Sequence, residues 1–84
     1  MNKRRLLKKA LTAPKNFRFD DFAVLVQSFG FRISRARGSD HIYIHPSIPE
    51  LVNIQEVDGE AKPYQIRQFL KLVERYDLRL EDEQ

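Results

Sequence analysis

Two histidines, His41 and His45, stand in the middle of this 84-residue chain. Histidine is the side chain that ordinarily changes its charge near neutral pH, so it is the usual group for proton transfer. In metal-free cleavage of RNA it can take the proton of a 2′-hydroxyl or give one to the leaving 5′-oxygen. The residue type alone decides nothing, because a lone histidine on a strand is more often structural than catalytic.

The spacing of the histidines places them on one face of a strand but far apart. Side chains alternate here, so Ile42 and Ile44 share one face while both histidines and Tyr43 share the other. Four steps along a strand span roughly 13 Å. The two rings therefore cannot share a proton or a metal ion without a bend, and we expect His45 to pack against the proline loop that follows it.

His41 follows a short turn that is flanked by basic side chains. Gly38 and Ser39 form the turn, and Arg35 and Arg37 precede it. Exposed backbone N–H groups beside arginines can bind a phosphate, so we expect RNA contacts from the two arginines and from the turn. The alternative is an ordinary hairpin turn with a solvated flank.

Lys62 is a further candidate for a phosphate contact. It stands directly before Pro63, which suits the first turn of a helix because the missing N–H costs nothing there. Anions bind well at helix N-termini, and a lysine adds positive charge.

The acidic residues near these candidates predict no metal site. Asp40 is adjacent to His41, but neighbours on a strand point to opposite faces, so direct pairing needs a distorted turn. Glu56, Asp58 and Glu60 match no established spacing of metal ligands. We expect these acids to be surface side chains.

The distribution of charge is more informative than its sum. The net charge is +3. Basic residues gather before the first acid, Asp20, and again just ahead of Gly38, while acids gather near the C-terminus. This segregation favours a polyanionic partner, although a solvated surface with a basic arm explains it equally well.

Length and composition exclude several classes of protein. A chain of 84 residues allows one domain with one modest core, and a hydrophobic fraction of 42% is enough to build it. Without cysteine there is neither a disulfide nor a thiolate metal site. No apolar run approaches the ~20 residues that span a bilayer, and the basic start lacks the apolar stretch of a secretory signal. We expect a soluble cytoplasmic protein with no membrane partner.

Amphipathic helices and alternating strands must position the candidate residues. Apolar residues recur at i, i+3, i+4 and i+7 in two segments, which is the spacing of a helix face. Apolar and polar side chains alternate in two further segments, and a third segment also has the composition of a strand. The predicted elements are helices over 19–29 and 63–76 and strands over 31–37, 41–45 and 51–57. Gly30 is a natural left-handed terminator of the first helix, Pro46 and Pro49 bracket a loop, and Asp58-Gly59 ends the third strand.

These elements predict an α+β fold. Two amphipathic helices can bury their stripes on one face of a three-stranded antiparallel sheet, which is the α-β-β-β-α topology of a double-stranded-RNA-binding domain. An extra basic helix over 2–12 can pack on the domain, dock on a partner or fray. The expected division is a helical extension over 1–18, the α+β domain over 19–78 and a frayed acidic tail over 79–84.

Short motifs in a fixed order make the chain resemble the HicA family. They cover roughly residues 19–78 and comprise Gly30-Phe31, Arg37-Gly38-Ser39-Asp40-His41-Ile42-Tyr43, His45-Pro46, Gly59, Lys62-Pro63 and the helix through Val73. The resemblance implies the double-stranded-RNA-binding fold and metal-independent endoribonuclease activity toward messenger RNA. It also implies the toxin role in a type II toxin–antitoxin module, a HicB-like antitoxin that covers the active site, and no cofactor.

The chain departs from the family at the catalytic position. The family histidine follows a glycine and a small residue, and Asp40 occupies that place here; His41 matches a second histidine that the family often carries. Three alternatives follow. In the first, His41 takes over the catalytic role through a shift of the turn. In the second, Asp40 acts as the base, and in the third the chain does not cleave RNA. A carboxylate that ionises near pH ~4 is a weak base at pH 7 unless it is buried. We therefore favour His41 and rank Asp40 last.

Two non-enzymatic classes compete with the toxin. The first is an RNA-binding or antitoxin-binding module that Asp40 has made inactive, and its affinity for RNA should fall steeply with salt. The second is a protein-binding adaptor whose basic N-terminal helix docks on an acidic partner.

Overall fold

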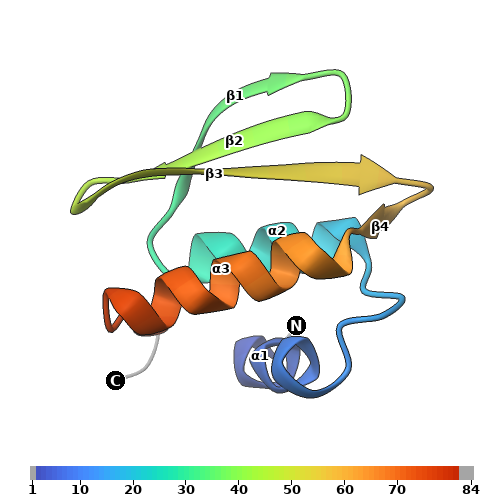
Figure 1. The fold of residues 1–84 in the computed structure, drawn as a ribbon, viewed down its shortest axis with the longest axis horizontal. Helices are drawn as coiled ribbons and strands as arrows, with labels where there is room; N and C mark the ends of the chain where they lie inside the picture. Colours follow the sequence, from blue (N-terminus) through green and yellow to red (C-terminus); the bar gives the residue numbers. More distant parts are fainter. Residues whose placement is uncertain (1, 82–84) are drawn as a thin grey trace.

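The computed structural model describes residues 2–81, which form three helices and a four-stranded antiparallel sheet. The elements are α1 (Lys3–Thr12), α2 (Phe19–Ser28), β1 (Arg32–Arg37), β2 (Asp40–His45), β3 (Ile48–Val57), β4 (Glu60–Ala61) and α3 (Pro63–Arg75), as Figure 1 shows. The α+β class is confirmed, and so are the three predicted helices. None of the described helices is long and apolar enough to cross a membrane.

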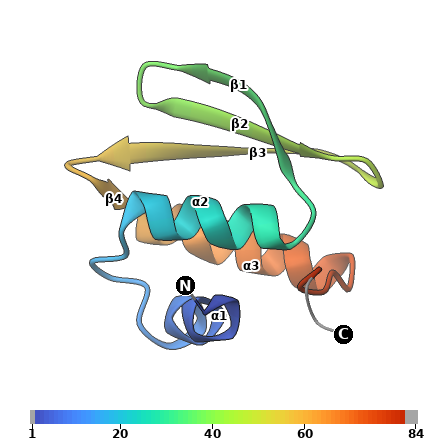
Figure 2. The same ribbon diagram turned by 180° about the vertical axis from the view of Figure 1, so that it is seen from behind.

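The elements stack in three layers. The sheet forms the first, α2 and α3 lie together beneath it, and α1 packs on the far side of that pair (Figures 1 and 2). Leu6 and Ala10 of α1 are buried in the same hydrophobic cluster as the residues of α2 and α3. Of the arrangements left open for the basic helix, packing on the domain is the one observed.

The core is centred on the ring of Phe69 in α3. Its centroid lies 5.7 Å from that of Phe22, 5.7 Å from that of Phe29 and 5.5 Å from that of Phe31. All three pairs meet edge to face, which is the arrangement that the quadrupoles of aromatic rings favour. Phe22 and Phe29 come from α2 and Phe31 precedes β1, so one ring ties together both central helices and the sheet.

The two faces of β2 differ as the alternation predicts. Tyr43 is 3% exposed, whereas Ile44 is 43% exposed. The register pairs His41 with Ile54, which is buried, and Asp40 with Gln55. Since paired residues of an antiparallel sheet point to the same side, His41 lies on the face toward the helices and Asp40 on the outer face.

The boundaries of β3 correct one prediction. The loop expected between Pro46 and Pro49 is shorter, because β3 begins at Ile48, which is buried and pairs with His45. Pro49 is tolerated inside the strand since β3 pairs with β4 only at its other end, so the edge away from β2 is free at Pro49.

The sheet also has a fourth strand that the sequence pattern did not predict. Asp58-Gly59 does not simply end β3 but forms a hairpin turn into β4, with φ of 53° and 78°. Two consecutive residues with positive φ are typical of the turn that Asp-Gly favours in hairpins. On its other side β4 is bonded by the segment before α2, because the N–H of Ala61 donates to the carbonyl of Phe17.

The start of the predicted acidic tail packs on the domain. Leu80 is buried, and the N–H of Glu81 donates to the carbonyl of Ser28 at the end of α2. Residues 82–84 of the tail lie outside the described residues. Leu6, Ala10 and Leu80 thus share the core of residues 19–78.

Gly30 adopts the left-handed conformation that the sequence predicted for a helix terminator, with φ of 96°. A Cβ there would lie 2.9 Å from Nε2 of His45 and 2.9 Å from Oε2 of Glu81. We expect Gly30→Ala to lower the free energy of unfolding by about 1–3 kcal/mol in urea denaturation, through backbone strain together with the two close contacts. Gly59→Ala is the matched control, since its φ is 78° and its Cβ would meet nothing within 4 Å. A loss for Gly30→Ala that is no larger than the loss for Gly59→Ala would contradict a contribution from the contacts at Gly30.

Tyr76, which follows α3, donates a short hydrogen bond to Glu50 at the start of β3. That bond, reinforced by desolvation and by the carboxylate charge, raises the pKa of Tyr76 above its ordinary value of 10.0. The bond therefore stabilises the fold below pH ~10, and its contribution is lost as pH rises through the raised pKa.

Absorbance titration of the tyrosines should detect this shift. We expect an ionisation above the ordinary tyrosine range that Tyr76→Phe removes and that Tyr64→Phe, which changes an exposed ring, leaves in place. Persistence of the late ionisation in Tyr76→Phe would show that the Glu50 bond is not its cause.

Candidate nucleic-acid interface

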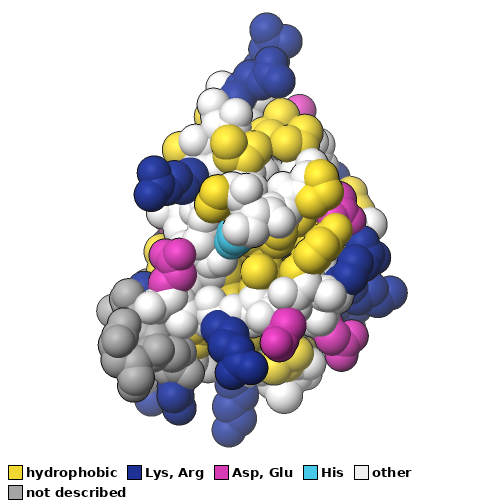
Figure 3. All heavy atoms as spheres, turned by 90° about the vertical axis from the view of Figure 1, so that its left-hand side faces the viewer, with side chains coloured by type: hydrophobic (Ala, Val, Ile, Leu, Met, Phe, Trp, Pro, Cys, Tyr) yellow, Lys and Arg dark blue, Asp and Glu magenta, His cyan; other side chains and the backbone are white. Residues whose placement is uncertain are grey.

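The predicted site residues gather at one end of the molecule. The β1–β2 turn, the β3–β4 turn and the starts of α2 and α3 all lie at the right-hand end of Figure 1. Figure 3 shows the opposite end, where hydrophobic side chains are exposed in the middle and basic side chains are scattered around the margin. The candidate interface is therefore the end that carries the two turns.

A small pocket on the outer face of the sheet brings four residues together. It has a volume of about 260 Å³ and is lined by Arg35, Arg37, Asp40 and Ile42. The register places Arg35 opposite Ile42 and Arg37 opposite Asp40. Both arginines are exposed, and neither forms an ion pair with any residue between 2 and 81. We call this the arginine pocket.

A bulge in β1 creates the arginine pocket. Ile33 pairs with Tyr43, but the next pair is Arg35 with Ile42, so Ser34 is the extra residue. Regular alternation from Arg32, which pairs with Ile44, would turn Arg35 toward the helices. The bulge instead turns Arg35 onto the outer face beside Asp40.

A chain of hydrogen bonds connects Asp40 with Lys62. Nε2 of Gln55 donates to Oδ1 of Asp40 at 2.7 Å, and Nζ of Lys62 donates to Oε1 of Gln55 at 2.6 Å. Lysine only donates and a carboxylate only accepts, so the amide of Gln55 has one orientation that satisfies both. The chain crosses from β2 through β3 to the first residue before α3, and it places Lys62 next to the predicted site.

Gln65 holds the middle of this hydrogen-bond chain in place. Its side chain is 8% exposed, and its Oε1 accepts from the backbone N–H of Gln55 at 2.9 Å. That N–H points away from β2, toward the side on which β4 pairs with β3. The pairing with β4 covers only Glu56 and Val57, so it does not reach Gln55. Gln65 therefore replaces the missing strand partner and fixes β3 to α3. Neither glutamine was predicted, since nothing in the local sequence pattern marks them.

His41 lies on the other face of the sheet from the arginine pocket. Its ring packs on Phe19 at the start of α2, with centroids 4.8 Å apart, and is half-buried. Its Nδ1 lies 3.2 Å from the carbonyl oxygen of Ser39, which can only accept. A proton on Nδ1 makes this a hydrogen bond and leaves Nε2 as the nitrogen that can act as a base.

His45 has the structural role expected for it but a different partner. Its ring packs on Phe31 with centroids 5.1 Å apart, and its Nδ1 accepts from the N–H of Ser47. The predicted contact with the following loop is thus a hydrogen bond to one backbone N–H, and the ring itself faces the segment before β1.

The β1–β2 turn is exposed and is anchored by a carbonyl group. Gly38 has φ of 59°, and a Cβ there would meet nothing within 4 Å. The oxygen of Ser39 accepts from the N–H of Glu56 at 3.2 Å and faces His41. The role of Gly38 and Ser39 as backbone donors to phosphate stays a prediction.

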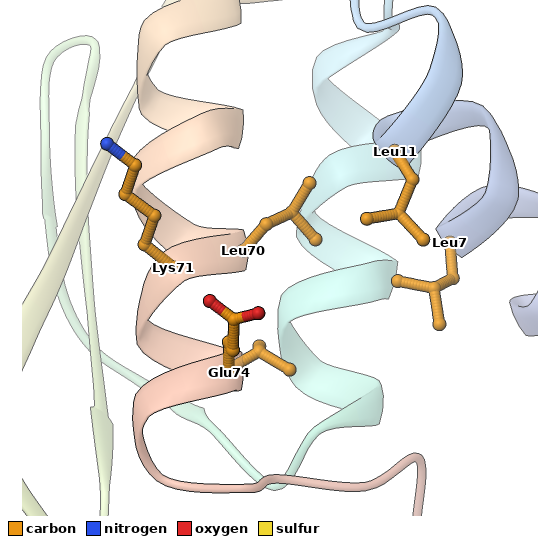
Figure 4. Close-up of a pocket in the computed structure, with 6 residues that line it drawn as sticks. Leu7, Leu11, Leu70, Lys71 and Glu74 are labelled. Carbon is orange, nitrogen blue, oxygen red and sulfur yellow. The ribbon is translucent and has the colours of Figure 1, made fainter.

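A second hollow lies between α1 and α3 and has a different character. Figure 4 shows Leu7 and Leu11 of α1 facing Leu70 of α3, with Glu74 below Leu70 and the side chain of Lys71 pointing away from the leucines. The hollow has a volume of about 330 Å³, and its middle is apolar. It offers no arginine to a phosphate, so it does not compete with the arginine pocket as a site for RNA.

The comparisons with known proteins identify no relative. No family model matches the sequence, and no curated protein or solved structure matches it either. Residues 2–81 also contain no group of three or more histidine, cysteine or acidic side chains that could hold a metal ion. The resemblance to the HicA family and the roles of the site residues therefore stay predictions from the sequence.

The hydrogen-bond chain predicts a measurable loss of stability in Gln55→Ala. Lys62 and Asp40 would both lose a charge-assisted bond, which we expect to cost about 1 kcal/mol because the groups are half-exposed. Asn53→Ala is the matched control, since it lies two residues earlier on the same strand face and forms no side-chain bond with the described residues. Equal unfolding midpoints in urea for both variants would show that the chain does not contribute to stability.

Proposed function

We propose that this chain is a cytoplasmic HicA-like toxin that binds messenger RNA and cleaves it without a metal ion, and that a HicB-like antitoxin neutralises it. The observation that carries the proposal is the arginine pocket, in which two unpaired arginines lie beside residue 40 at the end of the sheet. Unpaired arginines on an exposed sheet face suit phosphate groups, because the guanidinium binds two oxygens at once.

The arrangement of the elements supports the same proposal. The order α2-β1-β2-β3-α3, with both helices on one side of the sheet, agrees with the double-stranded-RNA-binding topology. Lys62 stands at the N-terminus of α3, where that fold faces nucleic acid. Arg35, Arg37 and Lys62 then supply the phosphate contacts.

In the proposed reaction His41 acts as general base. Its Nε2 takes the proton from a 2′-hydroxyl, the freed oxygen attacks the adjacent phosphorus, and the bond to the 5′-oxygen breaks. The leaving oxygen takes a proton from water. Because His41 and the arginine pocket lie on opposite faces of β2, the RNA has to pass over the exposed Gly38-Ser39 turn to reach both.

The second candidate is an RNA-binding or antitoxin-binding module without catalysis. Two observations support the absence of catalysis. Asp40 occupies the arginine pocket where the family has histidine, and the ring of His41 is packed on Phe19 away from that pocket. Such a module keeps the phosphate contacts and loses the reaction.

Induction in a bacterial host separates the two candidates. We expect wild-type chain to arrest growth and to shorten reporter RNA in a purified reaction with a chelator, and His41→Ala to lose both effects by at least about a hundredfold. Asn53→Ala should behave as the wild type. Activity of His41→Ala equal to wild type would overturn the assignment of the base.

Asp40→His tests the alternative directly. Arrest by this variant alone, with a silent wild type, would identify an inactive member of the family. Loss of RNA binding in Arg35→Ala and Arg37→Ala, with a steep dependence on salt, is expected in both cases. RNA binding unchanged by both substitutions would contradict both candidates.

A further inference from the structure

We propose that the arginine pocket reads a guanine base of single-stranded RNA and that Asp40 is the residue that determines this specificity. The inference rests on the proposed binding of RNA and adds the identity of one bound base. It requires no catalysis, so it applies equally to the toxin and to the inactive module.

The composition of the pocket argues against a bare anion as its ligand. Arg35 and Arg37 attract phosphate, but the carboxylate of Asp40 lines the same pocket and repels phosphate. A ligand that satisfies all three must present negative charge to the arginines and hydrogen-bond donors to Asp40. A nucleotide has this combination, because its phosphates and its base N–H groups lie on one molecule.

Among the four RNA bases, guanine matches a carboxylate best. Its Watson–Crick edge presents two adjacent donors, N1–H and the N2 amino group, and a carboxylate offers two acceptor oxygens. Adenine and cytosine each place an acceptor beside their amino group, and uracil has one N–H between two carbonyls. RNA-binding proteins commonly read bases of single strands on this edge.

The structure holds the carboxylate ready for such a contact. Gln55 donates to Oδ1 of Asp40, and Gln55 is itself fixed by Lys62 and by Gln65. A carboxylate has about four lone-pair directions, so this bond leaves Oδ2 and part of Oδ1 for a ligand. A pre-oriented acceptor loses little side-chain entropy on binding, which favours specificity.

The remaining wall and the size of the pocket suit a base. Ile42 is partly buried and gives the pocket an apolar side chain that a ring plane can cover. The volume of about 260 Å³ lies just below the range of ~300–1,000 Å³ that is typical of sites for drug-sized ligands. One nucleobase with its flanking phosphates on the arginines is therefore a better match than a larger ligand.

The test uses the full chain and three fluorescent oligouridines that differ only in one central nucleoside, which is guanosine, inosine or adenosine. We expect the guanosine oligomer to bind about tenfold more tightly than the adenosine oligomer, as for a good bidentate contact. Inosine lacks the N2 amino group and should fall between them. Because the inosine comparison uses the wild type, it holds even if a variant fails to fold.

Asp40→Asn should bring the guanosine and adenosine affinities within about twofold, since an amide cannot accept from both donors. Glu56→Gln is the matched control; it removes one exposed carboxylate from neighbouring β3 and should keep the preference. Equal binding of all three oligomers by the wild type would overturn the guanine assignment and leave RNA binding intact.

Two other outcomes also count against the inference. A guanosine preference that persists in Asp40→Asn would overturn the role of Asp40. Failure of every oligomer to bind at low salt would overturn the proposed RNA-directed function together with this inference, and would leave a protein as the partner of the pocket.

Discussion

The fold depends on the ring of Phe69 and the three rings that meet it edge to face. Phe22 and Phe29 bring α2 to this ring, and Phe31 brings the start of β1. A small domain has one core, so a single well-packed cluster has to orient every layer. The rings continue outward, because Phe31 contacts His45 and Phe22 contacts Phe17. The start of β1, the end of β2 and the helix α2 therefore all contact the same aromatic cluster.

The candidate interface depends on this core only indirectly. The position of Arg35 is set by the bulge in β1, and the position of Asp40 is set by the bond with Gln55. Gln55 in turn is fixed by side chains from the start of α3, whose next turns carry Ile66 and Phe69 into the core. The hydrogen-bond chain thus fixes the position of Asp40 on the outer face of the sheet relative to α3. The aromatic rings do not contact this face.

Periodicity predicted most of the fold because apolar side chains have to face one core. The stripe of α2 and the left-handed Gly30 both follow from local pattern. The features that the sequence did not predict depend on partners that are distant in sequence. Ser34 is an extra residue only relative to β2, and β4 is a strand only because β3 and the segment before α2 pair with it. The residues of the candidate site could be listed from the sequence, but not the sheet face on which each one lies.

The exposed position of β1 has a consequence for how the interface behaves. Every residue of this strand is exposed, and Figure 1 shows it at the sheet edge farthest from the helices. Little apolar surface is released when such a strand separates from its neighbour, so local opening there costs far less than global unfolding. The strand that carries the arginines can therefore adjust its twist to the shape of a bound chain while the aromatic cluster stays intact. The exposed strand β1 is thus the adaptable part of the domain, and the aromatic cluster on the other face of the sheet is the rigid part.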